Sequence, residues 1–450
     1  MKEHLVVVGF DEIVSNKYLE IIEDGIRNDI LSGYSIIDLE TQKDDIKNRL
    51  RMLKTKPKNV YYLNNKKQNQ WADRDEFGPV IDKIIDSEKQ IKIYIATELK
   101  AHEEYLQYCV DNDIKCLVEK PIFSPMNELG RFSPEFITIK MNDLKSSISK
   151  NKNNVSIMTL SRYHPIYNDI VFSNIKERLN KYKAPITSLH LRHAGGIWNL
   201  MKEYETREDH PYKYGYGMIM HGGYHYIDLF IQFLELNKSL FPDEEFELML
   251  CSFSGFPKDQ DIRIPKNFLN QEKKDWAEWE EVIYDCGETD IVTSYCLKNK
   301  NTDKVLTVGT ISLEQTTPSV RNWEEFPEGV YNKNGRTSLV EIEVQLATLH
   351  SLNVQCYDVP VKGVKEVERI DAFAKVLTRS NATLLPDEEY ITESSYDGLF
   401  HSQSNKALMK NWIFNCENKS TLEQHTNVMK LVQALCESTK NNGKQITYEF

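Results

Sequence analysis

The chain has no surplus of positive charge and no long apolar run. Its 56 lysine and arginine residues are outnumbered by 68 aspartate and glutamate residues, which gives a formal net charge of -12 at pH 7. A protein that binds nucleic acid needs basic surface to neutralise phosphates, so this balance argues against such a partner. No apolar run approaches the ~18 residues that cross a bilayer, and we therefore expect no membrane span.

Paired cysteine motifs are absent as well. The eight cysteines are scattered along the chain and include no C-x-x-C pair. Their spacing predicts neither a zinc site nor a disulfide framework. The charged start before the apolar residues 5–8 is too short for a signal peptide. We therefore expect a cytoplasmic protein that binds no metal ion.

The length of the chain indicates more than one domain. A chain of 450 residues is too long for one hydrophobic core, and its 40% apolar and 28% charged residues are typical of a globular protein. Over the first ~150 residues, short apolar runs alternate with amphipathic stretches, which predicts a parallel, doubly wound α/β sheet. The polar residues 151–154 mark the boundary that we expect between a first domain, residues 1–154, and a second, residues 155–450.

The second domain is rich in strand-like segments with few helices between them. A helix is expected around residues 166–179 and another around residues 224–234. The strand-like segments predict a large, mostly antiparallel sheet and hence an α+β domain. They are residues 247–253, 291–297, 305–314, 337–346 and 352–359.

One strand–helix–strand unit, at residues 91–118, indicates a functional edge of the first sheet. Its first apolar strand ends at Thr97 and its second at Glu119. The carboxyl ends of parallel strands meet at one edge, and ligands bind there in open α/β sheets. Lys120 follows directly, with Pro121 restricting the backbone behind it. We therefore expect Lys120 at a functional rim.

The turn after the first strand lacks two of the three glycines of a dinucleotide-binding fingerprint. Gly9 is present, whereas Asp11 and Val14 occupy the other two positions. The carboxylates of Asp11 and Glu12 also lie where a dianionic pyrophosphate would bind. One pair of like charges ~5 Å apart, at an effective dielectric constant of ~20, repels by about 3 kcal/mol. Binding is hard to sustain if both side chains face the site, and it is only weakened if they point to solvent.

Asp38 and Glu40 lie at the end of the second strand. Either carboxylate could accept a hydrogen bond from a ribose hydroxyl, which would favour NAD over NADP. The alternative is a solvated carboxylate at a strand end.

Three motifs, in this order and spacing, resemble those of one family of oxidoreductases. Thr97 with His102 resembles a T-P-x-x-x-H turn, with Glu98 at the proline position. Residues 119–121 match an E-K-P signature, and residues 217–228 are similar to G-G-x-x-x-D-x-G-x-H-x-I-D. The family is that of glucose–fructose oxidoreductase and inositol 2-dehydrogenase, also called Gfo/Idh/MocA.

The resemblance implies a Rossmann-like domain that binds NAD or NADP, with NAD favoured, and a substrate-binding α+β domain whose large sheet supports homo-oligomerisation. In such enzymes the E-K-P lysine, here Lys120, contacts the reacting hydroxyl, and the H-x-I-D histidine, here His225, moves the proton. A histidine titrates near neutral pH and a lysine stabilises an oxyanion, so the chemistry agrees. The implied cofactor-binding residues are Gly9, Phe10, Asp38, Thr97, His102, Glu119 and Lys120.

His221 stands where the family usually has aspartate. We expect His221 and His225, four residues apart, to share one face of a helix. If these two histidines bound a metal ion, the sequence would offer no evident third ligand. The spacing therefore favours a substrate pocket in which His221 assists His225, and the alternative is a buried histidine bonded to backbone.

Weaker candidates for substrate binding follow from position alone. Arg162 resembles a family arginine near the site, and His193 and Trp198 flank a glycine turn that could fold over a substrate. Each could equally be structural. The full set of substrate-binding candidates is Arg162, His193, Trp198 and Tyr224.

The leading interpretation is an NAD(P)-dependent oxidoreductase. It would transfer a hydride to or from a hydroxyl or carbonyl carbon of a sugar, a cyclitol or a similar small polar metabolite. One alternative is a family member that has lost dinucleotide binding and acts as a binding or accessory protein, which the acidic turn favours. Another is an imine reductase of a biosynthetic pathway.

Overall fold

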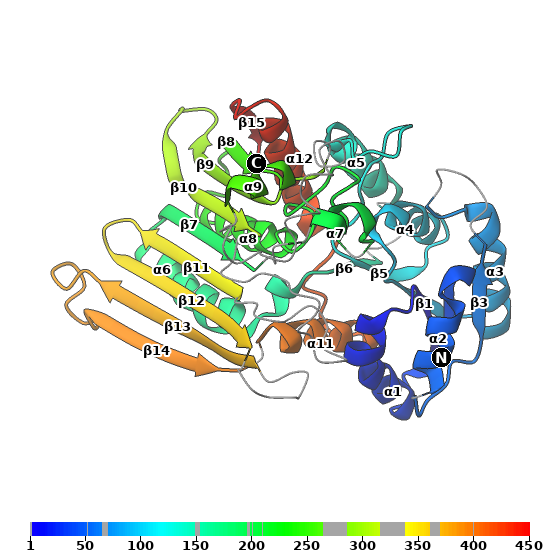
Figure 1. The fold of residues 1–450 in the computed structure, drawn as a ribbon. Helices are drawn as coiled ribbons and strands as arrows, with labels where there is room; N and C mark the ends of the chain where they lie inside the picture. The colour runs from blue at the N-terminus through cyan, green and yellow to red at the C-terminus, as the bar shows by residue number, and fades with distance from the viewer. Residues whose placement is uncertain are drawn as a thin grey trace. The chain divides into compact units, whose positions relative to one another are not determined.

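The structure is a computed structural model, and the chain divides into two compact units (Figure 1). Unit 1 consists of Met1–Tyr163 and His401–Met429, and unit 2 consists of His164–Phe400 and Lys430–Phe450. The residues that the structure describes are 2–51, 53–64, 71–148, 154–195, 199, 201–208, 210–263, 286–315, 338–360, 370–398 and 400–450.

Unit 1 alternates strands with helices, as the sequence predicts. Its strands are β1 (Glu3–Val8), β2 (Leu31–Leu39), β3 (Val60–Leu63), β4 (Ile91–Ile95), β5 (Lys115–Glu119) and β6 (Val155–Met158). Its helices are α1 (Leu19–Arg27), α2 (Lys43–Arg51), α3 (Arg74–Glu88), α4 (His102–Asp111), α5 (Ile137–Ile148) and, apart from its first residue, α11 (Phe400–Ile413). The strands form one parallel sheet in the order β3-β2-β1-β4-β5-β6, which is the doubly wound order expected.

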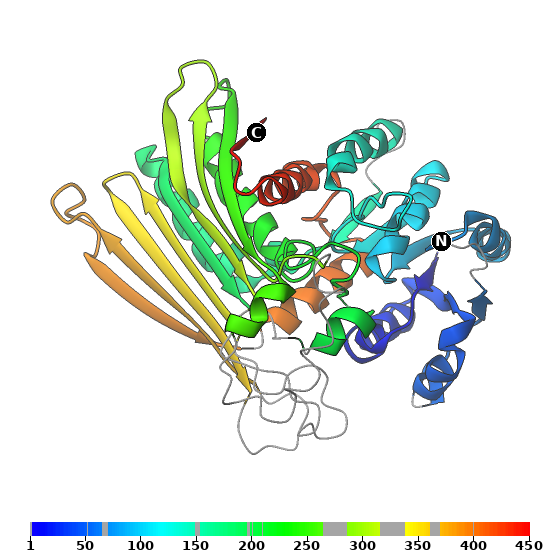
Figure 2. The ribbon, with the colours of Figure 1, turned by 45° about the horizontal axis from the view of Figure 1, so that its top comes forward.

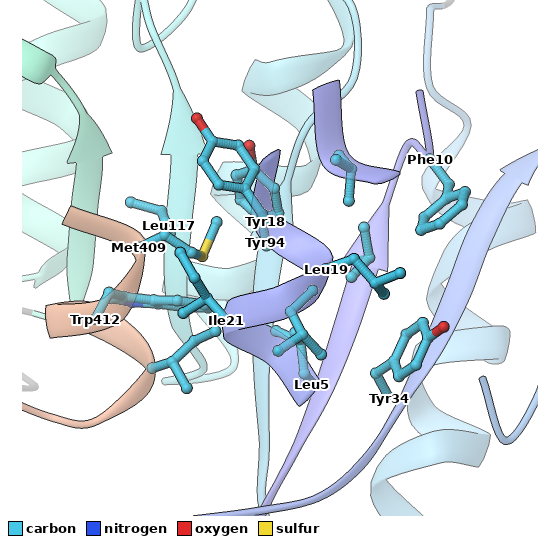
Figure 3. Packing of buried hydrophobic residues seen from close by; sticks show 14 of the residues in the cluster. Leu5, Phe10, Tyr18, Leu19, Ile21, Tyr34, Tyr94, Leu117, Met409 and Trp412 are labelled. Carbon is cyan, nitrogen blue, oxygen red and sulfur yellow. The ribbon is translucent and has the colours of Figure 1, made fainter. Parts of the chain in front are cut away.

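The core of unit 1 joins the N-terminal sheet to a helix from far along the chain. Leu5, Tyr94 and Leu117, from three neighbouring strands, pack in one buried cluster with Met409 and Trp412 of α11 (Figure 3). The strands are nearly continuous apolar runs because helices cover both faces of a parallel sheet. Helix α11, although far along the chain, is therefore part of the core of unit 1.

A buried lysine ties the start of the sheet to the end of α11. The side chain of Lys92, on β4, is fully buried, and its Nζ donates to Ile413 O at 3.1 Å and to Asn415 Oδ1 at 3.2 Å. Nζ also lies 2.6 Å from a carboxylate oxygen of Glu3. Burial lowers the pKa of Lys92 to about 8, while Glu3 opposes that shift. The ammonium group thus satisfies carbonyls at a helix C-terminus, where positive charge is favourable.

The boundary between the units differs from the expected one. We expected residues 155–450 to form the second domain, but β6 pairs in parallel with β5, with Cys116 opposite Val155 and Glu119 opposite Met158. Ile157 N then donates to Ser420 O at 2.9 Å. Unit 1 accordingly extends to Tyr163 and takes back part of the C-terminal region. The polar stretch that suggested a boundary is followed by one more strand of the same sheet.

Unit 2 contains the large antiparallel sheet that the sequence predicts. Its order is β14-β13-β12-β11-β7-β10-β9-β8-β15, and only the β7–β10 pair is parallel. The strands are β7 (Ile186–Ala194), β8 (Phe246–Gly255), β9 (Asp290–Asn299), β10 (Val305–Glu314), β11 (Ser338–Leu346), β12 (His350–Pro360), β13 (Ile370–Ser380), β14 (Ile391–Asp397) and β15 (Ile446–Glu449). The helices are α6 (Ser173–Tyr182), α7 (Met201–Thr206), α8 (Tyr224–Lys238), α9 (Gln260–Arg263) and the end of α12 (Thr426–Lys440).

Helix α8 packs on one face of this sheet, next to β7 (Figure 2). Asn237, near the end of α8, is buried, and its amide both accepts from Ile186 N at 2.8 Å and donates to Ile186 O at 2.9 Å. These two bonds, together with one from Asn237 to Thr307, hold the helix to the beginning of β7. The N-terminal end of α8 is thereby placed toward the other end of the strand.

Within the part of the chain that the structure describes, no helix is long and apolar enough to cross a bilayer.

Gly9, directly after β1, generates a stability prediction. Its φ is +85°, and a Cβ atom there would lie 2.8 Å from Ala96 O. We expect Gly9→Ala to lower the free energy of unfolding by about 2 kcal/mol or more, because both the conformation and the space disfavour a side chain. Urea denaturation followed by circular dichroism measures the change.

Gly130 provides a matched control for that substitution. Its φ is +69°, but the nearest atom to a Cβ there, in Trp71, is 3.9 Å away. Gly130→Ala should therefore cost only the conformational part, about 1 kcal/mol. Equal losses in the two variants would show that the contact of Gly9 with β4 does not matter.

Candidate functional site

The carboxyl ends of β1 and β4 form the centre of the candidate site in unit 1. These two strands are neighbours at the point where the strand order reverses, and ligands of open α/β sheets bind outside that point. Gly9 N donates to Ile37 O at 2.9 Å, and Ala96 N donates to Val8 O at 2.8 Å. The backbone is therefore closely packed where the chain leaves both strands.

Asp11 caps the helical segment that follows Gly9. Its backbone oxygen accepts from Ser15 N at 3.2 Å, and its Oδ1 accepts from Val14 N at 2.8 Å. Asp11 is therefore the N-cap residue, with a side chain that satisfies one of the free N–H groups of the first turn. The neighbouring carboxylate of Glu12 accepts from Asn16 at 3.4 Å instead.

Asp38 orients the same turn from the end of β2. Its Oδ2 accepts from Phe10 N and its Oδ1 from Leu39 N, both at 2.7 Å. Burial raises the pKa of Asp38, and the two backbone hydrogen bonds oppose that shift. Arg49 donates to Phe10 O at 3.0 Å from the other side. Each carboxylate oxygen of Asp38 keeps a second acceptor position, so a contact with a ribose hydroxyl stays a prediction.

His102 joins the turn after β4 to the loop after β5. The ring is buried, with Nε2 3.0 Å from Thr97 O and Nδ1 2.9 Å from Pro121 O. Burial lowers the pKa of His102 to about 4, so the ring is neutral at pH 7. The side-chain hydroxyl of Thr97 is also buried, and among the described residues it has no hydrogen-bond partner.

Lys120 lies at the edge where the sequence predicts it. It is half-buried, directly after β5, and its charge acts on both Glu119 and His102. Glu119 accepts a hydrogen bond from Tyr94 at 2.7 Å. Burial raises the pKa of Glu119, while the bond from Tyr94 and the charge of Lys120 lower it. The ring of Tyr18 meets that of Tyr94 edge-on, at 5.8 Å between centroids.

Arg162, a substrate-binding candidate, contacts backbone in unit 1. Its guanidinium is buried and donates to Lys419 O at 3.3 Å and to Gln424 O at 3.1 Å. These bonds attach the segment after α11 to the end of Met1–Tyr163, the first of the two stretches of chain that make up unit 1. A direct role with substrate stays a prediction.

In unit 2, the expected helical face of His221 and His225 is wrong. Helix α8 begins at Tyr224, so His221 lies in a turn that precedes it. Gly223 N donates to Met218 O at 3.0 Å, and a Cβ at Gly223 would lie 2.5 Å from that oxygen. The absence of a side chain at Gly223 leaves room for this close contact in the turn that carries His221.

The ring of His221 is surrounded by other aromatic rings. Its centroid lies 4.8 Å from that of Tyr212, 5.1 Å from that of His210 and 5.6 Å from that of Tyr216, and all three rings meet it edge-on at interplanar angles of 77° to 84°. Edge-to-face packing of this kind is favourable and restricts the imidazole. Tyr212 and Tyr216 therefore pack on His221.

His193, on β7, lies beside the beginning of α8. Its ring stacks on that of Tyr226 at 3.8 Å between centroids, and a Cβ at Gly222 would lie 3.7 Å from its Nε2. His225 and Tyr224 are buried in the first turn of the same helix. The structure thus brings His193 next to the segment that carries His221 and His225. Trp198 lies outside the described residues.

Glu288 is a buried carboxyl that the sequence analysis did not identify. Its Oε1 accepts from Ile219 N at 2.8 Å, and its backbone oxygen accepts from Met218 N at 2.8 Å. Burial raises the pKa of Glu288 to about 7, against the effect of its backbone hydrogen bonds. It supports the turn that carries His221, from a position too far along the sequence for any local motif to reveal.

No group of three or more histidine, cysteine, aspartate or glutamate side chains in the described ranges is arranged to hold a metal ion.

Comparison with known proteins gives structural matches only. No protein-family model matches the chain, and no curated protein matches it. An inositol dehydrogenase homolog from Azotobacter vinelandii, complexed with NADH and myo-inositol, has a TM-score of 0.54 at 12% identity, over 100% of this chain and 98% of that one. A myo-inositol 2-dehydrogenase from Lactobacillus plantarum has a TM-score of 0.53 at 12% identity, over 99% of each chain.

An oxidoreductase from Agrobacterium radiobacter, in complex with NAD+, L-tartaric acid and magnesium, has a TM-score of 0.54 at 11% identity, over 99% of this chain and 98% of that one. These similarities span the full length of the chain. The expected fold of both units is therefore confirmed: the chain has the fold of these oxidoreductases.

Glu288 generates a prediction about pH and stability. Its pKa is about 7 in the folded protein and ~4.3 in an unfolded chain. The folded state binds more protons between these values, so stability falls as the pH rises from about 5 to 7. Glu288→Gln keeps an acceptor for Ile219 N–H without titrating. Between about pH 5 and 7 the free energy of unfolding of this variant should therefore fall by about 2 to 3 kcal/mol less than that of the unsubstituted protein.

Urea denaturation at a series of pH values measures this difference. Glu245→Gln, which changes an exposed glutamate of the same unit, is the control and should follow the unsubstituted protein. An unchanged pH dependence in Glu288→Gln would contradict the prediction.

Proposed function

We propose that this chain is an NAD-dependent oxidoreductase of the glucose–fructose oxidoreductase and inositol 2-dehydrogenase family. It transfers a hydride to or from a hydroxyl-bearing or carbonyl carbon of a sugar, cyclitol or similar small polar molecule. One observation carries the proposal: Lys120 and the buried Thr97 hydroxyl lie at the carboxyl edge of a parallel sheet. A structure with the same fold binds NADH and myo-inositol.

Three features of unit 1 fit a nicotinamide dinucleotide. Gly9 provides the tight turn, Asp38 ends the second strand with acceptor positions to spare, and Thr97 offers a buried hydroxyl that has no partner among the described residues. These residues, with Phe10 and Glu119, would hold the cofactor. When bound, its nicotinamide ring supplies the hydride acceptor or donor. Asp11, whose carboxylate caps the following helix, opposes binding.

The chain's own residues would stabilise the negative charge that develops on the substrate oxygen and would accept the hydroxyl proton. An alcohol that loses hydride also loses its hydroxyl proton, so a cation near the oxygen and a base near the proton both accelerate the step. Lys120 would stabilise the oxyanion, and His225 would accept the proton. Glu119, bonded to Tyr94, would position Lys120 through its charge.

A second candidate function is a binding or accessory protein without a dinucleotide. The hydrogen bond from Val14 N to Asp11 favours it, because it neutralises the helix terminus on which a pyrophosphate would bind. Calorimetric titration with NAD+, NADH, NADP+ and NADPH decides between the two. Binding of one of them supports the oxidoreductase, and no binding to the folded protein leaves the second candidate.

Lys120→Met tests the proposed chemistry once a substrate is found. We expect kcat/KM for alcohol oxidation to fall by about two to three orders of magnitude, because a stabilising charge at the oxyanion is lost. Lys115→Met, the same change at the opposite end of β5, is the control and should retain activity. Normal alcohol oxidation by Lys120→Met would refute the role of Lys120. Lost alcohol oxidation with retained imine reduction would instead indicate an imine reductase.

We further propose that the open face of the unit 2 sheet forms a homo-oligomer. A groove of about 660 Å³ crosses this face, lined by charged side chains that include Arg192, Glu341 and Lys375. Exposed Val292 and Phe253, opposite each other on β9 and β8, add an apolar patch to the same face, and Val308 is exposed farther along it. Charges of both signs beside an apolar patch suit contact with a second copy of the same face.

Val292→Asp should therefore dissociate the oligomer, because it places a charge in the apolar contact. Leu384→Asp, which alters an exposed residue away from that face, is the control. Light scattering after gel filtration measures the mass. A monomer before any substitution, or an unchanged oligomer in Val292→Asp, would contradict this proposal.

A further inference from the structure

We infer that Asp11 is an intramolecular ligand of the dinucleotide turn: its carboxylate occupies the helix terminus that would receive a pyrophosphate and must leave before a cofactor binds. The inference rests on the proposed function, because it concerns the cofactor of the same site. It goes further in naming the residue that sets the affinity.

Two backbone N–H groups in the turn after β1 are already hydrogen-bonded. An anion at a helix N-terminus binds to free backbone N–H groups. Here Val14 N–H donates to Asp11 and Phe10 N–H donates to Asp38. Two donors of the turn are thus satisfied by carboxylates of the chain itself.

The carboxyl edge of β1 and β4 also carries negative charge. Burial raises the pKa values of Tyr18 and Tyr94, and the negative charges of Glu119 and Asp11 raise them further. Asp11 and Glu119 therefore act on the same two tyrosines at the carboxyl edge of β1 and β4. An incoming dianion meets both carboxylates, and the positive end of the helix is already compensated by Asp11.

The carboxylates of Asp38 and Asp11, which both accept from the turn, differ in exposure to solvent. Asp38 is largely buried between β2 and the turn, whereas Asp11 is exposed. Asp11 can therefore rotate into solvent and release Val14 N–H without unpacking the core. The apparent dissociation constant of a dinucleotide then rises in proportion to how rarely the turn is open.

Three variants separate charge from hydrogen bonding. Asp11→Asn keeps a capping oxygen but removes the charge, and Asp11→Gly removes both. Glu12→Gln, the control, neutralises the adjacent carboxylate, which accepts a hydrogen bond from the side chain of Asn16. Circular dichroism confirms that each variant is folded, and Asp11→Asn decides the test if Asp11→Gly does not fold.

The probes are NADH and inorganic pyrophosphate, titrated calorimetrically into the full chain. We expect both to bind about tenfold more tightly to Asp11→Asn and about a hundredfold more tightly to Asp11→Gly, with little change in Glu12→Gln. In the absence of any ligand, the amide resonance of Val14, in protein labelled at valine nitrogen, should shift in Asp11→Gly because its hydrogen bond is lost.

The outcomes distinguish this inference from the proposed function. Tighter binding of pyrophosphate and NADH to the Asp11 variants, without turnover of any alcohol, supports the inference and counts against the enzyme. Tight NADH binding and turnover by the unsubstituted protein, with no gain in the Asp11 variants, supports the enzyme and overturns the inference. Equal gains in Glu12→Gln and the Asp11 variants also overturn it, since they would show a general charge effect.

Discussion

The close approach of Gly9 to the end of β4 is the constraint on which the candidate site of unit 1 depends. With no side chain between them, the backbones after β1 and β4 leave the sheet side by side. The next helix can then begin at Asp11, within reach of the sheet edge, while the turn at Thr97 remains beside it. His102 extends the arrangement to the loop after β5, and so the position of Lys120 also depends on this contact.

Much of the fold could be predicted from the sequence because local apolar patterns decide most strands. Strands β1 to β5 of the six-stranded sheet and the strands from β8 to β12 follow from such patterns. Strand β14 could not be predicted, since it is an edge strand whose side chains are mostly exposed and show no apolar alternation. The place of β6 and α11 in unit 1 depends on pairing with Cys116 and packing with Tyr94, which are contacts between distant parts of the chain.

The candidate site was predictable to a different degree in each unit. Motif spacing places Lys120 and Asp38 at the correct sheet edge, because parallel strands share that edge. It misplaced His221, since residue spacing alone implies a helix, whereas the chain makes a turn there in which Met218 O lies too close to Gly223 for a side chain. Glu288 could not be found, because a buried carboxyl takes its importance from the backbone N–H that it meets and not from its neighbours in sequence.

The buried ammonium of Lys92 has a consequence for biosynthesis. The partners of Lys92 near the end of α11 are made only after the whole of the intervening segment, His164–Phe400, has left the ribosome. Until then the sheet surface beneath Trp412 is exposed, and Lys92 has Glu3 but lacks its acceptors at Ile413 and Asn415. Non-local contacts of this kind slow folding and leave apolar surface open to aggregation. We therefore expect the first 163 residues of the nascent chain to need chaperone protection until residues up to Asn415 have been made.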